Sequence, residues 1–335
     1  MRSMKIDRSY IRKVRYAVQV VIFVLVLYVG FTFYLFAGDL MLGRVPSLPR
    51  PPSVEGFMPI GALMSLKLLV TAGIFDPVHP AALVLFCGAV LSSVLLKKSF
   101  CGWICPVGTL SEAVWRAGRR IFGKNLILPR CIDYPLRSLK YMLMAFFLFI
   151  ILVRMSSQEV IGFLSTPYWK VTDIKLLQFF IEMSLTTQIA IGVLIALSLI
   201  VKNFWCRYLC PYGGLLGLVS LLSPVKIKRT DLACIHCGLC SRHCPSLLPV
   251  DRKRVIRSPE CMGCLTCVSH CPAQGALDAM VTGRKRMSPL AFVLMVMSVY
   301  FGLILVAKLT GRWHSSVSYE ELRSLVPILD GLIHP

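Results

Sequence analysis

Five long apolar runs, each closed by polar or charged residues, dominate the hydrophobic pattern of this chain. A helix that crosses a bilayer needs roughly 17–25 predominantly apolar residues. The pattern therefore predicts membrane-spanning helices, which we place at residues 16–37, 80–96, 139–153, 188–201 and 289–307. The third and fourth runs are short for a span, so we expect those two helices to extend beyond these limits.

Two further apolar stretches carry charged side chains and are less suited to a bilayer core. Phe57–Phe75 contains Lys67 and two glycines, and Ile174–Leu185 contains a lysine and a glutamate. We expect both to form re-entrant or interfacial helices on the outer face. The run at residues 16–37 is longer than the apolar core of about 7–15 residues in a signal peptide, so we expect an uncleaved anchor.

Composition and charge support a membrane protein and exclude an ordinary soluble enzyme. The 335 residues are 56% hydrophobic and only 16% charged, whereas soluble domains carry roughly 25% charged residues. Segments 1–15, 97–140 and 202–288 hold 28 of the 37 Lys and Arg but 7 of the 16 Asp and Glu, which accounts for the whole net charge of +21. The positive-inside rule then predicts five spans with the N-terminus inside and the C-terminus outside.

The basic residues lie between the predicted spans and around cysteine motifs, so we do not expect a nucleic-acid partner. They set the topology, and they are also suited to an acidic electron carrier or to anionic lipid.

An internal repeat places similar cysteine motifs after the second and fourth predicted spans. Phe100–Gly108 reads FCGWICPVG, and Trp205–Gly213, 105 residues later, reads WCRYLCPYG. Both halves share one orientation, which implies a pseudo-two-fold axis along the membrane normal. The proline after the last cysteine of each motif suits the first turn of a new helix. We therefore expect both cysteine pairs to meet at helix junctions on the inner surface.

This repeat leaves three interpretations of its cysteines open. In the first interpretation the four cysteines form a metal or iron–sulfur centre with four ligands. In the second they form two redox-active dithiols, and in the third they are reduced structural thiols at a bend. The residues concerned are Cys101, Cys105, Cys206 and Cys210.

A doubled four-cysteine pattern follows the fourth span, and its second copy is offset by 27 residues at every position. This is the ligand pattern of bacterial two-cluster ferredoxins, in which the fourth cysteine of each run ligates the other cluster. The pattern predicts two [4Fe-4S] clusters, with Cys234, Cys237, Cys240 and Cys271 on cluster one and Cys261, Cys264, Cys267 and Cys244 on cluster two. Zinc sites usually combine two separated CxxC pairs, and disulfides are disfavoured on a reducing side.

The remaining cysteines and the histidines are given no ligand role. Cys87 lies in a predicted span as an ordinary thiol, and Cys131 is expected to be a spectator. His236, His243 and His270 lie beside cluster ligands and are expected to be surface or cluster-tuning residues. No histidine lies inside a predicted span, which excludes a membrane haem held by two histidines.

The expected fold is an all-α polytopic membrane protein with an inserted ferredoxin-like α+β segment. Residues 1–222 form the membrane domain with both C-x3-C-P motifs, 223–287 the cytoplasmic two-cluster domain, and 288–335 the fifth span and an outer tail.

Over residues 78–275, two C-x3-C-P motifs followed by a double ferredoxin motif resemble the membrane-bound polyferredoxins, the NapH-, NosR- and CcoG-like proteins. The resemblance implies a bacterial inner-membrane protein that passes electrons between the quinone pool, or a cytoplasmic donor, and a partner redox protein. The chain resembles a short stand-alone member, without the flavin-binding domain of the NosR type or the large β-rich domain of the CcoG type.

Three functions remain open at this stage. The first is an electron conduit that acts as part of a quinol dehydrogenase, with Asp76, His79 and Glu159 as candidate proton acceptors or as simple interfacial residues. The second is an assembly or repair factor that reduces a metal ion or disulfide of a client respiratory enzyme. The third is a redox sensor that signals through cluster oxidation.

Overall fold

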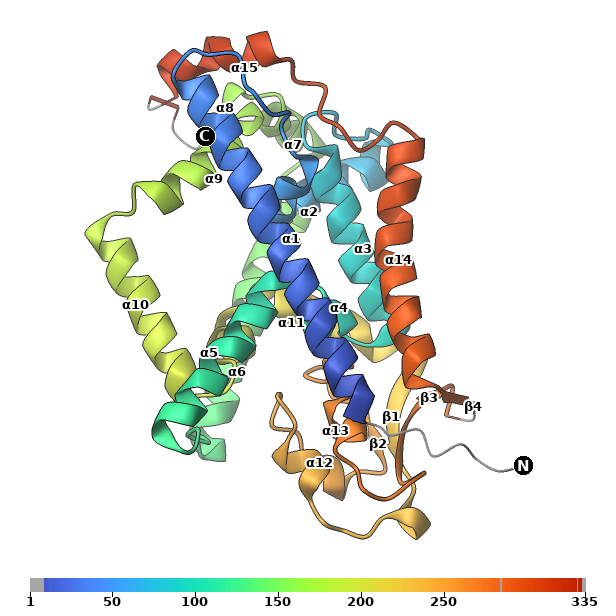
Figure 1. Cartoon of the computed structure of the whole chain (residues 1–335). Coiled ribbons are helices and arrows are strands. Elements are labelled where there is room, and N and C mark those ends of the chain that lie inside the picture. Colours follow the sequence, from blue (N-terminus) through green and yellow to red (C-terminus); the bar gives the residue numbers. More distant parts are fainter. Residues whose placement is uncertain (1–8, 284, 330, 333–335) are drawn as a thin grey trace. The chain divides into compact units, whose positions relative to one another are not determined.

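The computed structural model of the chain describes residues 9–283, 285–329 and 331–332 (Figure 1). These divide into two compact units, each built from three separate segments of the chain. The first unit comprises Met1–Phe23, Ala89–Met144 and Val193–Tyr300, and the second comprises Val24–Gly88, Ala145–Gly192 and Phe301–Pro335. The motif cysteines all belong to the first unit.

Three helices are long and apolar enough to cross a membrane by themselves. The helix α1 (Ser9–Met41) contains the first apolar run, and α14 (Pro289–Leu309) contains the fifth. The third run lies in one continuous helix, Arg130–Arg154, formed by α6 (Arg130–Leu148) and the π-helical η2 (Phe149–Arg154). This helix extends well beyond the run on its N-terminal side, as expected for a run that is short for a span.

The other two predicted spans fall short of this length. The helix α3 (Pro80–Leu96) has 17 residues, and α10 (Leu185–Ile200) has 16. The helix α10 qualifies as a span only together with α9 (Thr172–Ile181), and the two are bent by 79° at their break. The described residues thus form three candidate spans, or four if the bent pair is one span, where the sequence predicted five.

A small antiparallel sheet follows the membrane helices, in the order β2-β1-β3-β4. Its central strands are β1 (Val225–Arg229) and β3 (Leu277–Val281), and its edges are β2 (Val255–Ile256) and β4 (Lys285–Met287). In β1 every second side chain, Val225 and Ile227, is buried, as the period of a strand with one covered face requires. The register sets Ile227 opposite Ala279 of β3 and Ile256 of β2.

The short helices α12 (Leu239–Arg242) and α13 (Thr266–Ser269) complete a lobe with this sheet beyond the helices of the first unit (Figure 1). The chain is therefore mostly helical, with a four-stranded sheet in the region where the sequence predicted an α+β segment. The remaining elements are short helices: η1 (Pro52–Phe57), α2 (Pro59–Ala72), α4 (Ser99–Trp103), α5 (Pro106–Phe122), α7 (Ser157–Leu164), α8 (Pro167–Lys170), η3 (Trp205–Leu209), α11 (Pro211–Val219), η4 (Ser220–Leu222), η5 (Asp231–Ala233), η6 (Val250–Arg252), α15 (Tyr319–Leu325) and η7 (Val326–Ile328).

The second unit has its own apolar core, formed where short helices pack around Trp169. Leu68, Val160 and Leu164 are buried in one cluster with this ring. A Cβ atom on Gly61 would lie 2.1 Å from the ring, so only glycine allows α2 to approach it. The stretch Phe57–Phe75 forms the helix α2, and Ile174–Leu185 contributes to α9; their placement at an outer membrane surface stays a prediction.

Candidate cluster sites and a buried polar network

Both C-x3-C-P motifs form helix junctions. Cys105 precedes Pro106, which begins α5, and Cys210 precedes Pro211, which begins α11. Both cysteines have extended backbone, with ψ angles of 120° and 104°, before the chain turns into the helix. The Sγ atom of Cys210 accepts a hydrogen bond of 3.2 Å from the backbone N–H of Gly213. Each motif therefore presents a cysteine at a helix N-terminus, where a negative charge is stabilised.

The two motifs meet in one cavity, although 105 residues separate them in the chain. Its lining contains all four motif cysteines, Cys101, Cys105, Cys206 and Cys210. We call this space the junction cavity. Lys98 and Glu260, both almost completely buried, also line it. The arrangement brings four sulfur donors and one ammonium group around a single space.

The electrostatics of the junction cavity suit an anionic group held by thiolates. Burial raises the pKa of Cys101 to about 11 and that of Cys206 to about 12, so the bare side chains are neutral thiols at pH 7. Burial alone would lower the pKa of Lys98, but the negative charges of a Cys101 thiolate and of the Glu260 carboxylate more than offset this, and the pKa is raised. Bound iron would favour the thiolates in the same way as other coordinating metals.

The ferredoxin-like cysteines line two further cavities, and each cavity combines three cysteines of one run with the last cysteine of the other run. One cavity is lined by Cys234, Cys237, Cys240 and Cys271, and the other by Cys244, Cys261, Cys264 and Cys267. Among the described residues, no group of three or more His, Cys, Asp or Glu side chains is arranged to hold a single metal ion. Cys87 and Cys131 are not among the residues that line the three cavities.

The loops of the two ferredoxin cavities have the same backbone conformation. His236 and Gly238 have positive φ angles of 55° and 69°, and the positions 27 residues later, Gly263 and Leu265, have 58° and 55°. Left-handed backbone is uncommon for His and costly for Leu. A recurrence of this conformation at both positions indicates a shape that each loop needs in order to turn its cysteines inward. Of these four residues only Gly238 and Gly263 lack a side chain that opposes the left-handed conformation.

Two hydrogen-bond donors at the first ferredoxin cavity, both on the Arg229 side chain, lack an acceptor. The guanidinium of Arg229 lines this cavity, and its buried Nε and Nη1 atoms have no hydrogen-bond partner. The hydrogen bond from Arg229 also lowers the pKa of the Cys234 thiol. A buried donor without an acceptor is costly, and the sulfur atoms of an anionic cluster would supply the acceptors. The residues present therefore fit a bound iron–sulfur cluster.

The junction cavity and the second ferredoxin cavity share a wall. Pro245, Ser246 and Met262 line both of them. At this wall a Cβ atom on Gly102 would lie 2.8 Å from the carbonyl oxygen of Met262, so glycine is required for the close approach. Trp103 Nε1 also donates a hydrogen bond of 3.1 Å to the carbonyl oxygen of Gly263.

The two ferredoxin cavities are joined by α12 and α13, each of which is bounded by cysteines of both sets. His243 and His270, which follow these helices, stack with ring centroids 4.0 Å apart. The three cavities therefore follow one another in a series, from the helix junctions to the second and then the first ferredoxin cavity.

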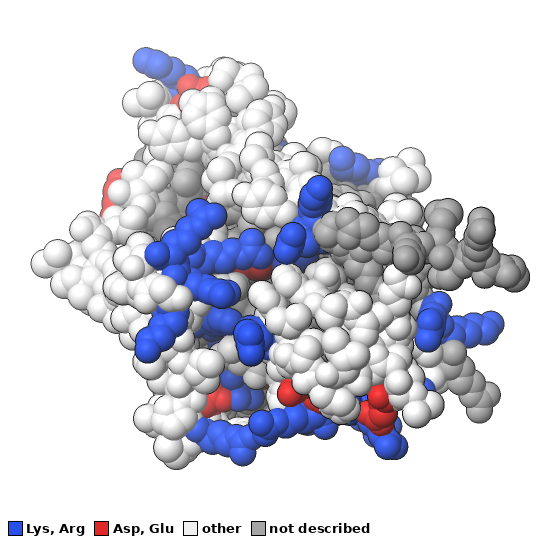
Figure 2. Space-filling model, turned by 60° about the horizontal axis from the view of Figure 1, so that its bottom comes forward, with Lys and Arg blue, Asp and Glu red and all other residues white. Residues whose placement is uncertain are grey.

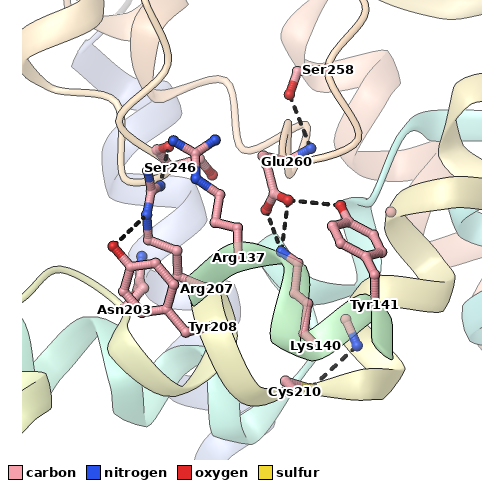
Figure 3. A network of polar contacts seen from close by, with 12 residues as sticks. Arg137, Lys140, Tyr141, Asn203, Arg207, Tyr208, Cys210, Ser246, Ser258 and Glu260 are labelled. Carbon is pink, nitrogen blue, oxygen red and sulfur yellow. Dashed lines mark hydrogen bonds and ion pairs between the residues drawn. The ribbon is translucent and has the colours of Figure 1, made fainter. Parts of the chain in front are cut away.

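Buried ion pairs on α6 hold the ferredoxin loops against the helix junctions (Figure 3). Lys140 Nζ donates to the two carboxylate oxygens of Glu260 at 2.7 and 2.6 Å, and Tyr141 OH donates to the same carboxylate at 2.8 Å. Glu260 directly precedes Cys261. A buried pair of this kind is strongly destabilising to break on one side only. Sequence reasoning did not identify these residues, and the one available signal was a lone acid beside a cluster cysteine in a basic segment.

A second buried group of hydrogen bonds, centred on Asp133 of α6, also holds a cluster loop in place. Asp133 accepts hydrogen bonds from Arg207 Nε at 2.9 Å and from Tyr208 OH at 2.7 Å. Arg207 Nη1 in turn donates to the carbonyl oxygen of Ser246 at 2.7 Å. Arg207 and Tyr208 lie between Cys206 and Cys210 in the chain, so this group fixes the second motif to the loop that lines two cavities.

The second unit contains a separate buried network that includes two of the candidate proton acceptors. Asp76 accepts from Ser65 Oγ at 3.0 Å and from Trp169 Nε1 at 3.2 Å. His79 lies 2.7 Å from the carbonyl oxygen of Trp169 and 3.3 Å from the carboxylate of Glu55. Burial alone would lower the pKa of His79, but the hydrogen bond and charge of Glu55 raise it overall.

A cavity of about 310 Å³ lies beside Asp76 in the same unit. Its lining is mainly apolar, with Asp76 and Lys170 as the charged members. An apolar cavity with a few polar groups is typical of a small-molecule site. Glu159 lies outside this lining: its carboxylate accepts from the backbone N–H of Ser156 and caps α7.

Comparison with known families matches the regions of the three cysteine cavities. The family model described as a 4Fe-4S binding domain matches twice, at residues 78–125 and 185–230. A 4Fe-4S dicluster domain matches residues 226–272. The two matches of the first model contain one C-x3-C-P motif each, which agrees with the internal repeat.

Curated proteins are similar to most of the chain or to its cysteine-containing part. The chain is 41% identical over 320 residues to the "Putative electron transport protein YccM" of Escherichia coli, covering 93% of this chain and 89% of that protein. It is 28% identical over 210 residues to the "Ferredoxin-type protein NapH" of the same organism, covering 59% and 62%. It is 26% identical over 160 residues to the "Regulatory protein NosR" of Stutzerimonas stutzeri, covering 46% and 21%. No solved structure matches the chain.

Proposed function

Because this chain belongs to the membrane-bound polyferredoxin family of NapH- and NosR-like proteins, we propose that it conducts electrons through three iron–sulfur centres in series. Cluster one would be held by Cys234, Cys237, Cys240 and Cys271, and cluster two by Cys244, Cys261, Cys264 and Cys267. A third centre would be held by Cys101, Cys105, Cys206 and Cys210. Each centre, when bound, supplies one-electron chemistry.

The observation that carries this proposal is the series of three cavities, each lined by four cysteines. Pro245, Ser246 and Met262 separate the junction cavity from cluster two, and α12 and α13 separate cluster two from cluster one. The protein residues position these centres and keep bulk water out between them. Lys98 places a buried positive charge against the junction cavity, which favours the reduced and more negative state of a centre bound there.

The cavity beside Asp76 supports a quinol as the membrane substrate. Quinol oxidation releases protons as well as electrons, so it needs an apolar pocket and a nearby base. The cavity provides both, with apolar walls and the carboxylate of Asp76. Electron transfer with the quinone pool would make the protein a component of a quinol dehydrogenase rather than a repair factor that uses a soluble reductant alone.

Mixing the purified protein with a reduced quinol analogue tests this function. We expect the visible absorbance of the clusters to decrease rapidly, and Asp76→Asn to slow this at least about tenfold, because general-base catalysis typically contributes 10²–10⁴-fold. Glu159→Gln is the matched control and should react like the wild type, since Glu159 lies outside the cavity. Clusters that respond to dithionite but not to the quinol analogue would contradict quinol chemistry.

We also propose that the chain crosses the membrane five times, with the cluster lobe in the bacterial cytoplasm. The charge distribution supports this orientation, and α3 and the bent pair α9–α10 would supply the two crossings beyond the three long helices. The short length of α3 is compatible with a span at the lower end of the range.

Reporter fusions test this topology directly. A reporter that is active only outside the cytoplasm should be inactive when fused after Gly283 and active when fused after Thr310, because α14 separates the two positions. The reverse pair of results would place the clusters outside and overturn the charge argument.

A further inference from the structure

An exposed apolar patch lies beside the cysteines of cluster one. Leu232 is fully exposed and Ile235 is 64% exposed, and these two residues flank Cys234 in the chain. Cys237, another ligand of the proposed cluster, is itself exposed. Large apolar side chains at this level of exposure contribute little to the fold of the lobe. They do place an apolar surface close in the chain to Cys237, the exposed ligand of the proposed cluster one.

Basic side chains lie in the same lobe as this patch, and the ion pair of Arg254 with Asp231 places one of them next to Leu232. Arg242, Arg252 and Lys253 are exposed, and Arg254 is 82% exposed. We call the patch and these four residues the cluster-one face. Between residues 229 and 254 the chain carries five basic and two acidic residues. Figure 2 shows one face of the molecule, on which Lys and Arg side chains are more widespread than Asp and Glu side chains.

Both acids of this segment are already engaged within the protein. Asp231 forms ion pairs with Arg229 at 2.6 Å and with Arg254 at 2.5 Å. Asp251 accepts a hydrogen bond from the Ser241 hydroxyl. The field that the cluster-one face presents to solvent is therefore positive.

We propose that the cluster-one face docks a small, acidic, water-soluble one-electron carrier. An apolar centre with a charged rim is the usual anatomy of a protein interface, and complementary charge accelerates the encounter. Redox encounters use the smallest interfaces, so a small apolar patch is sufficient. The proposal rests on the proposed function, because it requires cluster one to be the outermost centre of the series.

In each encounter one electron crosses the interface. During quinol oxidation the protein loses one electron and the carrier gains one. Reduced flavodoxin drives the same exchange in the opposite direction, and in neither direction is a bond formed or a proton required. Anionic lipid is the competing occupant of a basic and apolar patch. The cluster-one face favours the soluble carrier because it exposes the cluster ligand Cys237 among the docking residues, and a bilayer lying over this face would block the exchange of electrons with the aqueous phase.

Stopped-flow reduction of the full-length, cluster-loaded protein by reduced flavodoxin tests the proposal. With the protein in zwitterionic nanodiscs, we expect the second-order rate constant to fall steeply with ionic strength. The double variant Arg252→Glu/Lys253→Glu should lower it at least about tenfold at low salt, within the range of electrostatic steering, and much less at high salt. The variant Leu232→Ser should lower it at every salt concentration, because its contribution is apolar.

A matched charge reversal elsewhere on the same unit provides the control. The double variant Lys124→Glu/Arg130→Glu alters two exposed basic residues, one in the loop after α5 and one at the start of α6, and changes the net charge by the same amount. We expect its rate constant to stay within about twofold of the wild type, since steering depends on local complementarity. Equal losses in both double variants would show a response to total charge only and overturn the docking site.

The remaining outcomes separate the docking site from the proposed function. Iron content and EPR spectra report whether the clusters are present. If they are present and reduced by dithionite, but flavodoxin reacts equally fast with Arg252→Glu/Lys253→Glu, the docking site is wrong and the conduit stands. If the clusters are absent, both are wrong. An unchanged flavodoxin rate, combined with weaker binding of this variant to anionic vesicles, would assign the patch to lipid.

Discussion

Cys105→Ser and Cys210→Ser are expected to remove the same iron–sulfur centre, although they belong to motifs 105 residues apart. Both side chains line the junction cavity, where four sulfur donors surround one space. Each variant should lose about four of roughly twelve iron atoms per chain, the content of one [4Fe-4S] centre. The double variant should be no worse than either single one, because residues that act as one unit are not additive.

Iron quantification and EPR of the reduced protein measure this result. The signals of both ferredoxin clusters should persist in all three variants. Cys131→Ser is the control, because this exposed cysteine does not line any of the three cavities and should leave iron content unchanged. Full iron content combined with unequal, additive defects would instead indicate two independent thiol pairs.

We expect variants of the ferredoxin cysteines to have the same defect when the two cysteines line the same cavity, and not when they merely belong to the same sequence run. Cys244→Ser should resemble Cys261→Ser, and Cys240→Ser should resemble Cys271→Ser, since each pair lines one cavity. Each variant should lose or convert one cluster, with a fall of about four iron atoms. We expect these variants to lose more iron over time, because a small lobe of this kind depends on its metal for folding.

EPR spectra of the four single variants distinguish the two ways of sorting. Two spectral classes should appear, with one member of each sequence run in each class. If instead Cys240→Ser and Cys244→Ser fell into the same class, each run would hold its own cluster and the crosswise assignment would be wrong.

Much of the site was accessible from the sequence because its signals are local or periodic. The spacing of the eight ferredoxin cysteines predicted two sets of four, and these same sets line two cavities. The prolines after Cys105 and Cys210 predicted helix starts, and α5 and α11 begin there. The repeat predicted that both motifs would meet, and they line one cavity. In each case the prediction depends on residues within a short motif or on the repetition of that motif.

The predicted spans were less accurate, because hydropathy reports an apolar run and not the geometry of the helix. Residues 139–153 read as a short run, yet they belong to a helix that begins at Arg130. The bend of 79° between α9 and α10 has no signature in composition. The stretch Ile174–Leu185 contributes to a pair of helices that the sequence treated as two unrelated elements.

The amino-acid sequence was enough to identify the side chains that we propose as cluster ligands and the apolar segments of the chain, because spacing and hydrophobic period act over a few residues. The tertiary structure alone decided which charges lie against the proposed clusters. Glu260 and Lys140 are 120 residues apart in the chain. Arg229 lines the first ferredoxin cavity, and it belongs to β1, whose alternation of apolar and polar residues predicts only which side chains are buried. Such contacts form when elements that are distant in the chain pack together, and a buried charge then needs a partner. A local sequence pattern does not predict which residue that partner is.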